Sequence, residues 1–294
     1  MLACLLAALL AGCGGGEDVA NCAALRRSAP EKALEHCNRA IASRLVWSKE
    51  KARARLDRGA VFSDRGEWDA AIGDITRAID SSRLSPQHLV VAHFDRGTAR
   101  LQKGEVDAAI EDFDEAIRLD PLYADAFSNR ALARRVKGQL AESLADANAA
   151  LKITPRHAKA LLQRGATYLV QGEGAKSLAD LNEAIRIDPA LQGAWNIRGL
   201  LRRAARDWDG ALADFDQAVK LRPRDPGALR NRASVLVLKR DFDRALVDLD
   251  ASLKLDPRSA EALLRRAAIY AERGDQARMR ADQNAAAALR GPAN

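Results

Sequence analysis

The chain has 294 residues, of which 48% are hydrophobic, 30% are charged and only 4% are aromatic. This hydrophobic fraction can build a packed core and excludes wholesale disorder, while the length allows one large domain or two ordinary ones. The formal net charge of +7 comes from bases that alternate with acids along the whole chain. Because no basic tract with interleaved aromatics is present, we expect no nucleic-acid partner, although the positive excess favours anionic proteins or lipid headgroups.

The first residues have the features of an export signal. Positions 2–10 are apolar or small and run into Leu10-Ala11-Gly12-Cys13. A span of this length is too short to cross a bilayer, which takes about 20 residues. The tetrad resembles the lipobox of bacterial lipoproteins. The resemblance implies that residues 1–12 are a signal peptide, that Cys13 carries the lipid, and that residues 13–17 form the lipidated start and a flexible tether.

One feature departs from that pattern, because no Lys or Arg precedes the apolar run. An ordinary secretory signal, in which Cys13 has no role, is therefore the alternative. Gly14 and not Asp follows the cysteine, which resembles outer-membrane sorting in bacteria with two membranes. We expect an outer-membrane lipoprotein whose domain faces the periplasm.

Two cysteines remain after the signal, Cys22 and Cys37. An exported protein meets an oxidising compartment, where such a pair is typically a disulfide. Both lie in a segment, 18–48, that reads as a divergent helical hairpin from Val19 to Leu25 and from Glu31 to Ile41. Facing helices can bring two Cα atoms within the roughly 7 Å that a disulfide needs. We predict a Cys22–Cys37 disulfide, with two buried free thiols as the alternative.

Three sets of residues share one period of 34 residues. They are the prolines 121, 155, 189, 223 and 257, the arginines from Arg96 to Arg266, and the aspartates from Asp112 to Asp282. This period resembles that of the tetratricopeptide repeat (TPR), a helix–turn–helix unit. The resemblance implies an all-α fold, a TPR superhelical solenoid, with seven repeats over 49–290 of which the last is a degenerate C-terminal cap.

Small residues recur where the two helices of a TPR touch, as in Gly97, Ala109 and Ala116 of one repeat. Glycines recur between the helices at 66, 104, 138, 172 and 274, where a residue with positive φ ends the first helix. These positions predict the helix boundaries of most repeats.

The arginine and aspartate columns replace residues that are apolar in the usual TPR pattern. We predict a ladder of partly buried ion pairs, within a repeat or between neighbours, since a guanidinium can donate two parallel hydrogen bonds to a carboxylate. An arginine column that binds acidic ligands is the alternative. The predicted ladder comprises Arg96, Asp112, Arg130, Asp146, Arg164, Asp180, Arg198, Asp214, Arg232 and Asp248.

Catalytic and metal-binding patterns are missing from the sequence. The four histidines are scattered, and the two remaining cysteines lack the spacing of a zinc site. We predict that the chain is not an enzyme and has no cofactor and no metal.

The TPR resemblance also implies a binding groove on the first helices of the repeats. The residues expected there are Leu56, Phe94, Leu132, Arg135, Leu162, Leu169, Asn196, Leu200, Arg203, Arg230, Val237 and Leu238. This apolar and basic set favours a partner helix or an extended peptide. The alternative is that several of these residues pack against adjacent repeats and are not exposed.

Two functions remain open from the sequence. The first is a non-enzymatic scaffold or adaptor, similar to TPR lipoproteins of outer-membrane protein insertion, pilus assembly or cell-wall enzyme regulation. The alternative is an accessory protein that binds glycan, peptidoglycan or an anionic polymer through the basic groove. The sequence does not specify the partner or the oligomeric state.

Overall fold

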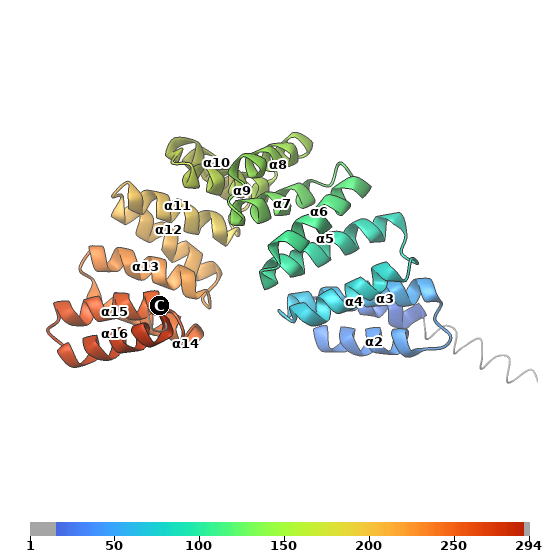
Figure 1. Cartoon of the computed structure of the whole chain (residues 1–294), viewed down its shortest axis with the longest axis horizontal. Helices are drawn as coiled ribbons and strands as arrows, with labels where there is room; N and C mark the ends of the chain where they lie inside the picture. Colours follow the sequence, from blue (N-terminus) through green and yellow to red (C-terminus); the bar gives the residue numbers. More distant parts are fainter. Residues whose placement is uncertain (1–15, 291–294) are drawn as a thin grey trace, which may run out of the picture. The chain divides into compact units, whose positions relative to one another are not determined.

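The computed structural model describes residues 16–290, and the helices in this part of the chain are joined by turns and short loops without any strand (Figure 1). The predicted all-α fold of helix–turn–helix repeats is confirmed. The proposed lipid site, Cys13, lies outside the described residues. None of the described helices is both long enough and apolar enough to span a membrane.

The chain divides into two compact units at Pro155–Arg156. The described part of unit 1 starts with a helix over 16–24 and continues through α2 (Pro30–Ala42), α3 (Ser48–Asp64), α4 (Trp68–Asp80), α5 (Pro86–Lys103), α6 (Val106–Leu119), α7 (Ala124–Val136) and α8 (Leu140–Ile153). Consecutive helices pack in pairs, and each first helix also packs on the second helix of the preceding pair.

Unit 2 has the same construction. Its helices are α9 (Ala158–Val170), α10 (Gly174–Ile187), α11 (Gln192–Ala204), α12 (Trp208–Leu221), α13 (Pro226–Leu238), α14 (Phe242–Leu255), α15 (Ala260–Glu272) and α16 (Gln276–Arg290). The first helices α9, α11, α13 and α15 contact one another in sequence and so form one face of the unit. We call this face the inner face of unit 2.

The turn between the two helices of a repeat requires a left-handed residue. The five glycines predicted there have φ between +74° and +89°. Arg206 and Arg240 occupy the same register in two repeats of unit 2, with φ of +63° and +60°. The left-handed turn is therefore set by the fold and is imposed even where the residue is not glycine.

Small side chains allow the paired helices to approach closely. Ala109, Ala116, Ala211 and Ala218 are completely buried. A Cβ added at Gly199 would lie 2.7 Å from the Phe215 ring. A larger side chain at these positions would push the helices apart.

The N-terminal hairpin is closed by a disulfide between Cys22 and Cys37, whose Cα atoms are 4.8 Å apart. Both residues are fully buried and pack with Val19, Ala40 and Val46. Positions 16 and 17, expected in the flexible tether, are already helical. The tether prediction is therefore wrong for these two residues, because the first helix begins earlier than the hydrophobic pattern suggested.

Candidate protein-binding surface

Arginine–aspartate pairs occur in every repeat and have one geometry. The arginine lies on the first helix, the aspartate sixteen residues later lies on the second, and the Nη2–Oδ1 distance is 2.6–2.8 Å in all seven pairs from Arg58–Asp74 to Arg266–Asp282. The aspartates are 1–7% exposed. Each pair thus joins the two helices of a repeat through a buried, bidentate contact.

Six of these seven arginines also reach the helical hairpin that precedes their own repeat. Arg130, Arg232 and Arg266 donate from Nη1 to Asp114, Asp216 and Asp250, while Arg58, Arg96 and Arg198 donate to Asn38, Thr76 and Asn182. The sequence left open whether the pairs act within a repeat or between repeats, and these contacts do both. We call the set the Arg–Asp column.

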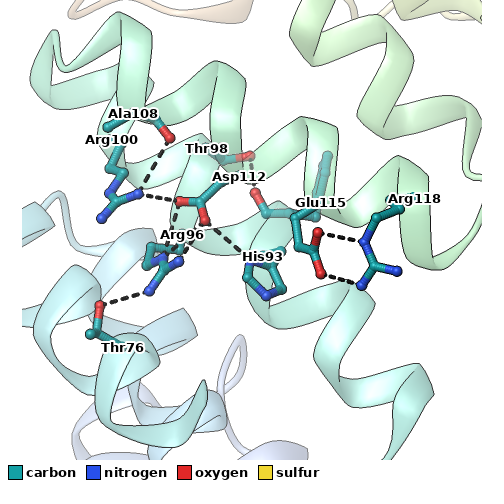
Figure 2. Close-up of polar contacts among 10 residues, drawn as sticks. Thr76, His93, Arg96, Thr98, Arg100, Ala108, Asp112, Glu115 and Arg118 are labelled. Atoms are coloured by element: carbon teal, nitrogen blue, oxygen red, sulfur yellow. Dashed lines mark hydrogen bonds and ion pairs between the residues drawn. The ribbon is translucent and has the colours of Figure 1, made fainter. Parts of the chain in front are cut away.

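A second arginine, one turn later on the first helix, joins three of the pairs. Figure 2 shows Arg96 and Arg100 approaching Asp112 together, with Nη–Oδ distances of 2.7 and 2.9 Å, and His93 at 3.1 Å. Burial alone would raise the pKa of Asp112, but the hydrogen bonds from His93 and Arg96 hold it below its ordinary value. Sequence analysis missed these second arginines, since Arg100, Arg134 and Arg202 recur in only three repeats.

A different environment surrounds Asp95, on α5 of unit 1. Burial raises the pKa of Asp95 to about 6, because the nearby Arg26 only partly offsets the loss of solvent and the negative charges of Asp64 and Asp57 act against ionisation. Arg26 is itself engaged by Asp64 through two hydrogen bonds of 2.6 and 3.1 Å. This half-buried carboxylate has no counterpart in the Arg–Asp column.

The inner face of unit 2 contains an open cavity of about 400 Å³. Its lining combines three consecutive first helices with the start of α12: Arg203, Trp208, Ser234, Val237, Leu238, Arg265 and Ala268. Leu238 is 51% exposed, so part of this apolar surface faces solvent. We call these seven residues the unit 2 pocket.

The charged groups around the pocket are loosely paired. Arg203 donates to the Ser234 hydroxyl at 2.8 Å, and burial together with the nearby Arg265 lowers the pKa of Arg203. Glu261 accepts from Arg265 at 2.8 Å and lies 3.5 Å from Arg230. The pocket therefore presents an apolar floor with guanidinium groups beside it, which suits an apolar segment carrying a negative charge.

The structure brings only some of the predicted groove residues together. Arg203, Val237 and Leu238 line the pocket. Half-buried positions on first helices are occupied by Leu132, Arg135, Leu169, Asn196, Leu200 and Arg230. Phe94 packs its ring against Phe113 and Tyr123, with centroids 6.1 and 5.0 Å apart.

Two groove predictions are wrong. Leu56 is 3% exposed and belongs to the core with Ile75 and Ala92, and Leu162 is 8% exposed. Packing against the next repeat covers them, so neither can contact a partner directly.

Four pocket residues were not predicted from sequence. Ser234 and Ala268 share the register of Leu200, which was predicted, but their small side chains gave no apolar signal. Trp208 is the first residue of a second helix, and Arg265 lies outside the expected groove positions. Among residues 16–290, no three His, Cys, Asp or Glu side chains are grouped so that they could hold a metal ion.

Stacked helix–turn–helix units with this period and these small-residue contacts define a helical repeat protein of the solenoid class. The tetratricopeptide repeat family profile matches residues 94–158, 130–191 and 198–249, together more than half of the chain. The chain belongs to the tetratricopeptide repeat family, whose repeats generally mediate protein–protein interactions.

Solved structures share the fold at low sequence identity. A tetratricopeptide repeat protein from Parabacteroides merdae has a TM-score of 0.58 and 19% identity, covering 82% of this chain and 93% of that one. Pseudomonas aeruginosa pilF has a TM-score of 0.61 and 19% identity over 71% of this chain and 95% of that one. A thermophilic TPR protein from Thermus thermophilus has a TM-score of 0.55 and 25% identity over 63% of this chain and 99% of that one. No match was found among curated protein sequences.

Proposed function

We propose that the chain is a membrane-anchored TPR lipoprotein that acts as a non-enzymatic scaffold in the periplasm and binds partner proteins on the inner face of unit 2. The unit 2 pocket is the observation that carries this proposal. It joins exposed apolar surface at Leu238 to the guanidinium groups of Arg203 and Arg265. A helix or extended peptide with apolar and acidic side chains complements such a surface.

The Arg–Asp column supports this choice of face by exclusion. Its arginines are engaged by buried carboxylates in each repeat, so an acidic ligand would have to displace an internal partner to bind them. Near the pocket, Arg203 donates to a serine hydroxyl and Arg265 donates to the exposed Glu261, so neither is held by a buried carboxylate. They remain suited to an external anionic group.

Partner capture tests the proposed binding face. Leu238→Asp places a charge on the apolar floor and should lower partner recovery from intact cells by at least about tenfold, the equivalent of about 1.4 kcal/mol. Val247→Asp is the matched control, because Val247 is 69% exposed on the second helix α14. Equal recovery with both variants would remove the pocket from the proposal.

The anchor is tested separately by metabolic labelling with a palmitate analogue. The resemblance of Leu10-Ala11-Gly12-Cys13 to a lipobox supports lipid attachment at Cys13. Labelled wild type and an unlabelled Cys13→Ser variant are expected. An unlabelled wild type would contradict the anchor but not the protein-binding face.

A glycan, peptidoglycan or anionic polymer is the second candidate ligand, favoured by the guanidinium groups beside Trp208. Such binding should weaken steeply between 50 and about 300 mM salt and disappear in Arg203→Glu, because it depends on charge. A protein partner held on the apolar floor should be much less sensitive to salt and should depend on Leu238.

A further inference from the structure

The loop after α2 lies at the same end of the N-terminal hairpin as the start of the described chain. Asp18, near the beginning of the first helix, accepts hydrogen bonds from Arg39 at 2.9 Å and contacts His36 at 2.6 Å near the end of α2. The helices are therefore antiparallel, and α2 ends only three residues after Arg39. The following loop, 43–47, is consequently close to the N-terminal end of the first helix.

This loop exposes two large apolar side chains in a fixed arrangement. Leu45 is 59% exposed and Trp47 is 78% exposed, while Val46 between them is buried in the core of the hairpin. The Leu45 N–H donates to the Ser43 hydroxyl and the Trp47 N–H donates to the Glu50 carboxylate, both at 3.1 Å. Leu45 and Trp47 are thus held outward by the fold, with most of their surface exposed to solvent.

Basic side chains surround the tryptophan. A cavity of about 300 Å³ is lined by Lys49, Arg53 and Arg83, and a neighbouring cavity of about 530 Å³ is lined by Trp47, Lys49 and Arg83. Glu50 is the acidic residue in the lining of the first cavity. The patch therefore combines an exposed aromatic ring, an exposed aliphatic side chain and an excess of positive charge.

We propose that Leu45, Trp47, Lys49, Arg53 and Arg83, which we call the N-terminal patch, bind the surface of an anionic bilayer. Trp47 and Leu45 would enter the boundary between headgroups and acyl chains, where tryptophan is enriched in membrane proteins. Lys49, Arg53 and Arg83 would contact lipid phosphates, an attraction worth about fivefold in affinity for each basic residue.

The position of the patch supports a bilayer as the occupant. Gly16 follows the proposed lipid site, Cys13, by three residues, and three residues of chain span at most about 11 Å. A lipid on Cys13 would therefore hold the patch close to the membrane, so that even weak surface contacts would be populated. This part of the argument rests on the proposed lipoprotein function. The exposed Trp47 ring and the charge complementarity support the patch independently of the lipoprotein function.

Vesicle binding by the unlipidated protein isolates the patch from the anchor. Residues 13–294 with Cys13→Ser, which lack the apolar signal segment 1–12 and have the disulfide formed, are sedimented with vesicles of phosphatidylcholine alone or with one quarter phosphatidylglycerol. We expect binding to the anionic vesicles to be at least about tenfold tighter than to the neutral ones and to weaken as salt rises. Brominated lipid should quench tryptophan fluorescence, and Trp47→Ser should remove that quenching.

Matched variants separate the patch from the general positive charge of the protein. Leu45→Ser/Trp47→Ser should lose at least about fivefold in affinity, whereas Leu122→Ser/Val247→Ser, which alters side chains that are 72% and 69% exposed elsewhere, should bind as wild type. Lys49→Glu/Arg83→Glu should lose more than Arg222→Glu/Lys254→Glu, which makes the same change in net charge in unit 2.

Equal losses in the paired variants would overturn the proposal, since net charge alone would then explain the binding. Tight binding without quenching from Trp47, or capture of a soluble anionic polymer in preference to vesicles, would overturn it as well. Absence of lipid on Cys13 in cells would contradict the lipoprotein function and would leave the vesicle result unaffected.

Discussion

The Arg–Asp column and the inner face of unit 2 both carry arginines, but they engage them differently. In the column, Arg198 and Arg232 each make two short hydrogen bonds to a buried carboxylate at a constant separation of sixteen residues. On the inner face, Arg203 donates a hydrogen bond to the Ser234 hydroxyl, and Arg230 lies 3.5 Å from Glu261. The column arginines are thus engaged by buried carboxylates inside the structure, whereas Arg203 and Arg230 have no buried carboxylate partner among the described contacts.

The carboxylates of unit 1 show the same contrast. Asp112 of the column is buried, but hydrogen bonds from His93 and Arg96 and the positive charges of Arg96 and Arg100 hold its pKa low. Asp95, also on a helix of unit 1, has no bidentate arginine among the described contacts, and its pKa is raised to about 6. Burial is therefore tolerated in the column because partners are supplied there.

Removing a column carboxylate should have the largest effect on stability. Asp214 is 1% exposed, accepts hydrogen bonds from Arg198 and forms an ion pair with Arg202. Asp214→Ala strands two partly buried guanidinium groups and should lower the free energy of unfolding by about 3–5 kcal/mol. Urea unfolding followed by circular dichroism measures the change.

Two further variants check that explanation. Asp209→Ala, on the same helix, removes an 87% exposed carboxylate that pairs with Lys239 and should cost less than about 0.5 kcal/mol. Arg232→Leu/Asp248→Phe replaces a whole pair by apolar residues and should recover most of the loss seen in Asp248→Ala. If Asp214→Ala were as stable as wild type, the column would have no structural role.

Asp95→Asn should have the next largest effect, and it should depend on pH. A carboxyl group whose pKa is raised in the folded state favours folding at pH below about 4, and this contribution is lost as pH rises through about 6. The neutral amide of Asp95→Asn should therefore raise the free energy of unfolding by about 1–3 kcal/mol at pH 8 and leave it unchanged at pH 4. Asp69→Asn, at an 83% exposed carboxylate, should show no such difference between the two pH values. A pH-independent effect of Asp95→Asn would refute this interpretation.

A glycine at the helix contact should tolerate no added methyl group. The Cβ of Gly199→Ala would lie 2.7 Å from the Phe215 ring, and overpacking of this kind should cost about 1–3 kcal/mol. Gly73→Ala is the control, because its Cβ would meet only the end of Arg77 at 3.6 Å. That control should gain up to about 1 kcal/mol from helix propensity, and a loss of the same size in both variants would argue against close contact as the cause.

The smallest effect is expected at the turns. Arg206→Gly removes the strain of a left-handed backbone at a residue with a side chain, but it also increases the entropy of the unfolded chain. The free energy of unfolding should therefore rise by only about 0.5 kcal/mol. The reciprocal Gly172→Arg should lose about 1 kcal/mol, since Gly172 has φ of +78°. Thermal unfolding midpoints compare the two variants. A destabilised Arg206→Gly variant would mean that the Arg206 side chain makes a stabilising contact.

Much of the fold was predictable because a solenoid repeats its local rules. The 34-residue period predicted the turns at Gly104 and Gly172, the small contacts at Ala109 and the arginine and aspartate columns. The candidate site was less predictable. Burial of Leu56 and Leu162 depends on how far the neighbouring repeat covers each first helix, which a sequence register does not specify.

Features that do not recur in every repeat were also not predicted from the sequence. Arg100 and Arg202 pair with the column aspartates of their own repeats, but arginine recurs at this position in some repeats only. A search for residues that share the 34-residue period therefore did not select them. Ser234 and Ala268 form the pocket because their side chains are small, whereas the search favoured large apolar groups. The division of the chain at Pro155–Arg156 had no signal in the repeat pattern.

Photo-crosslinking in intact cells tests most directly whether partners bind the inner face of unit 2. A photoreactive amino acid is placed either in place of Leu238, on the pocket floor, or in place of Val247, on α14, both of which are largely exposed. We expect crosslinks to discrete protein partners from position 238 and none from position 247. Crosslinks from 247 alone, or the same products from both positions, would contradict the account.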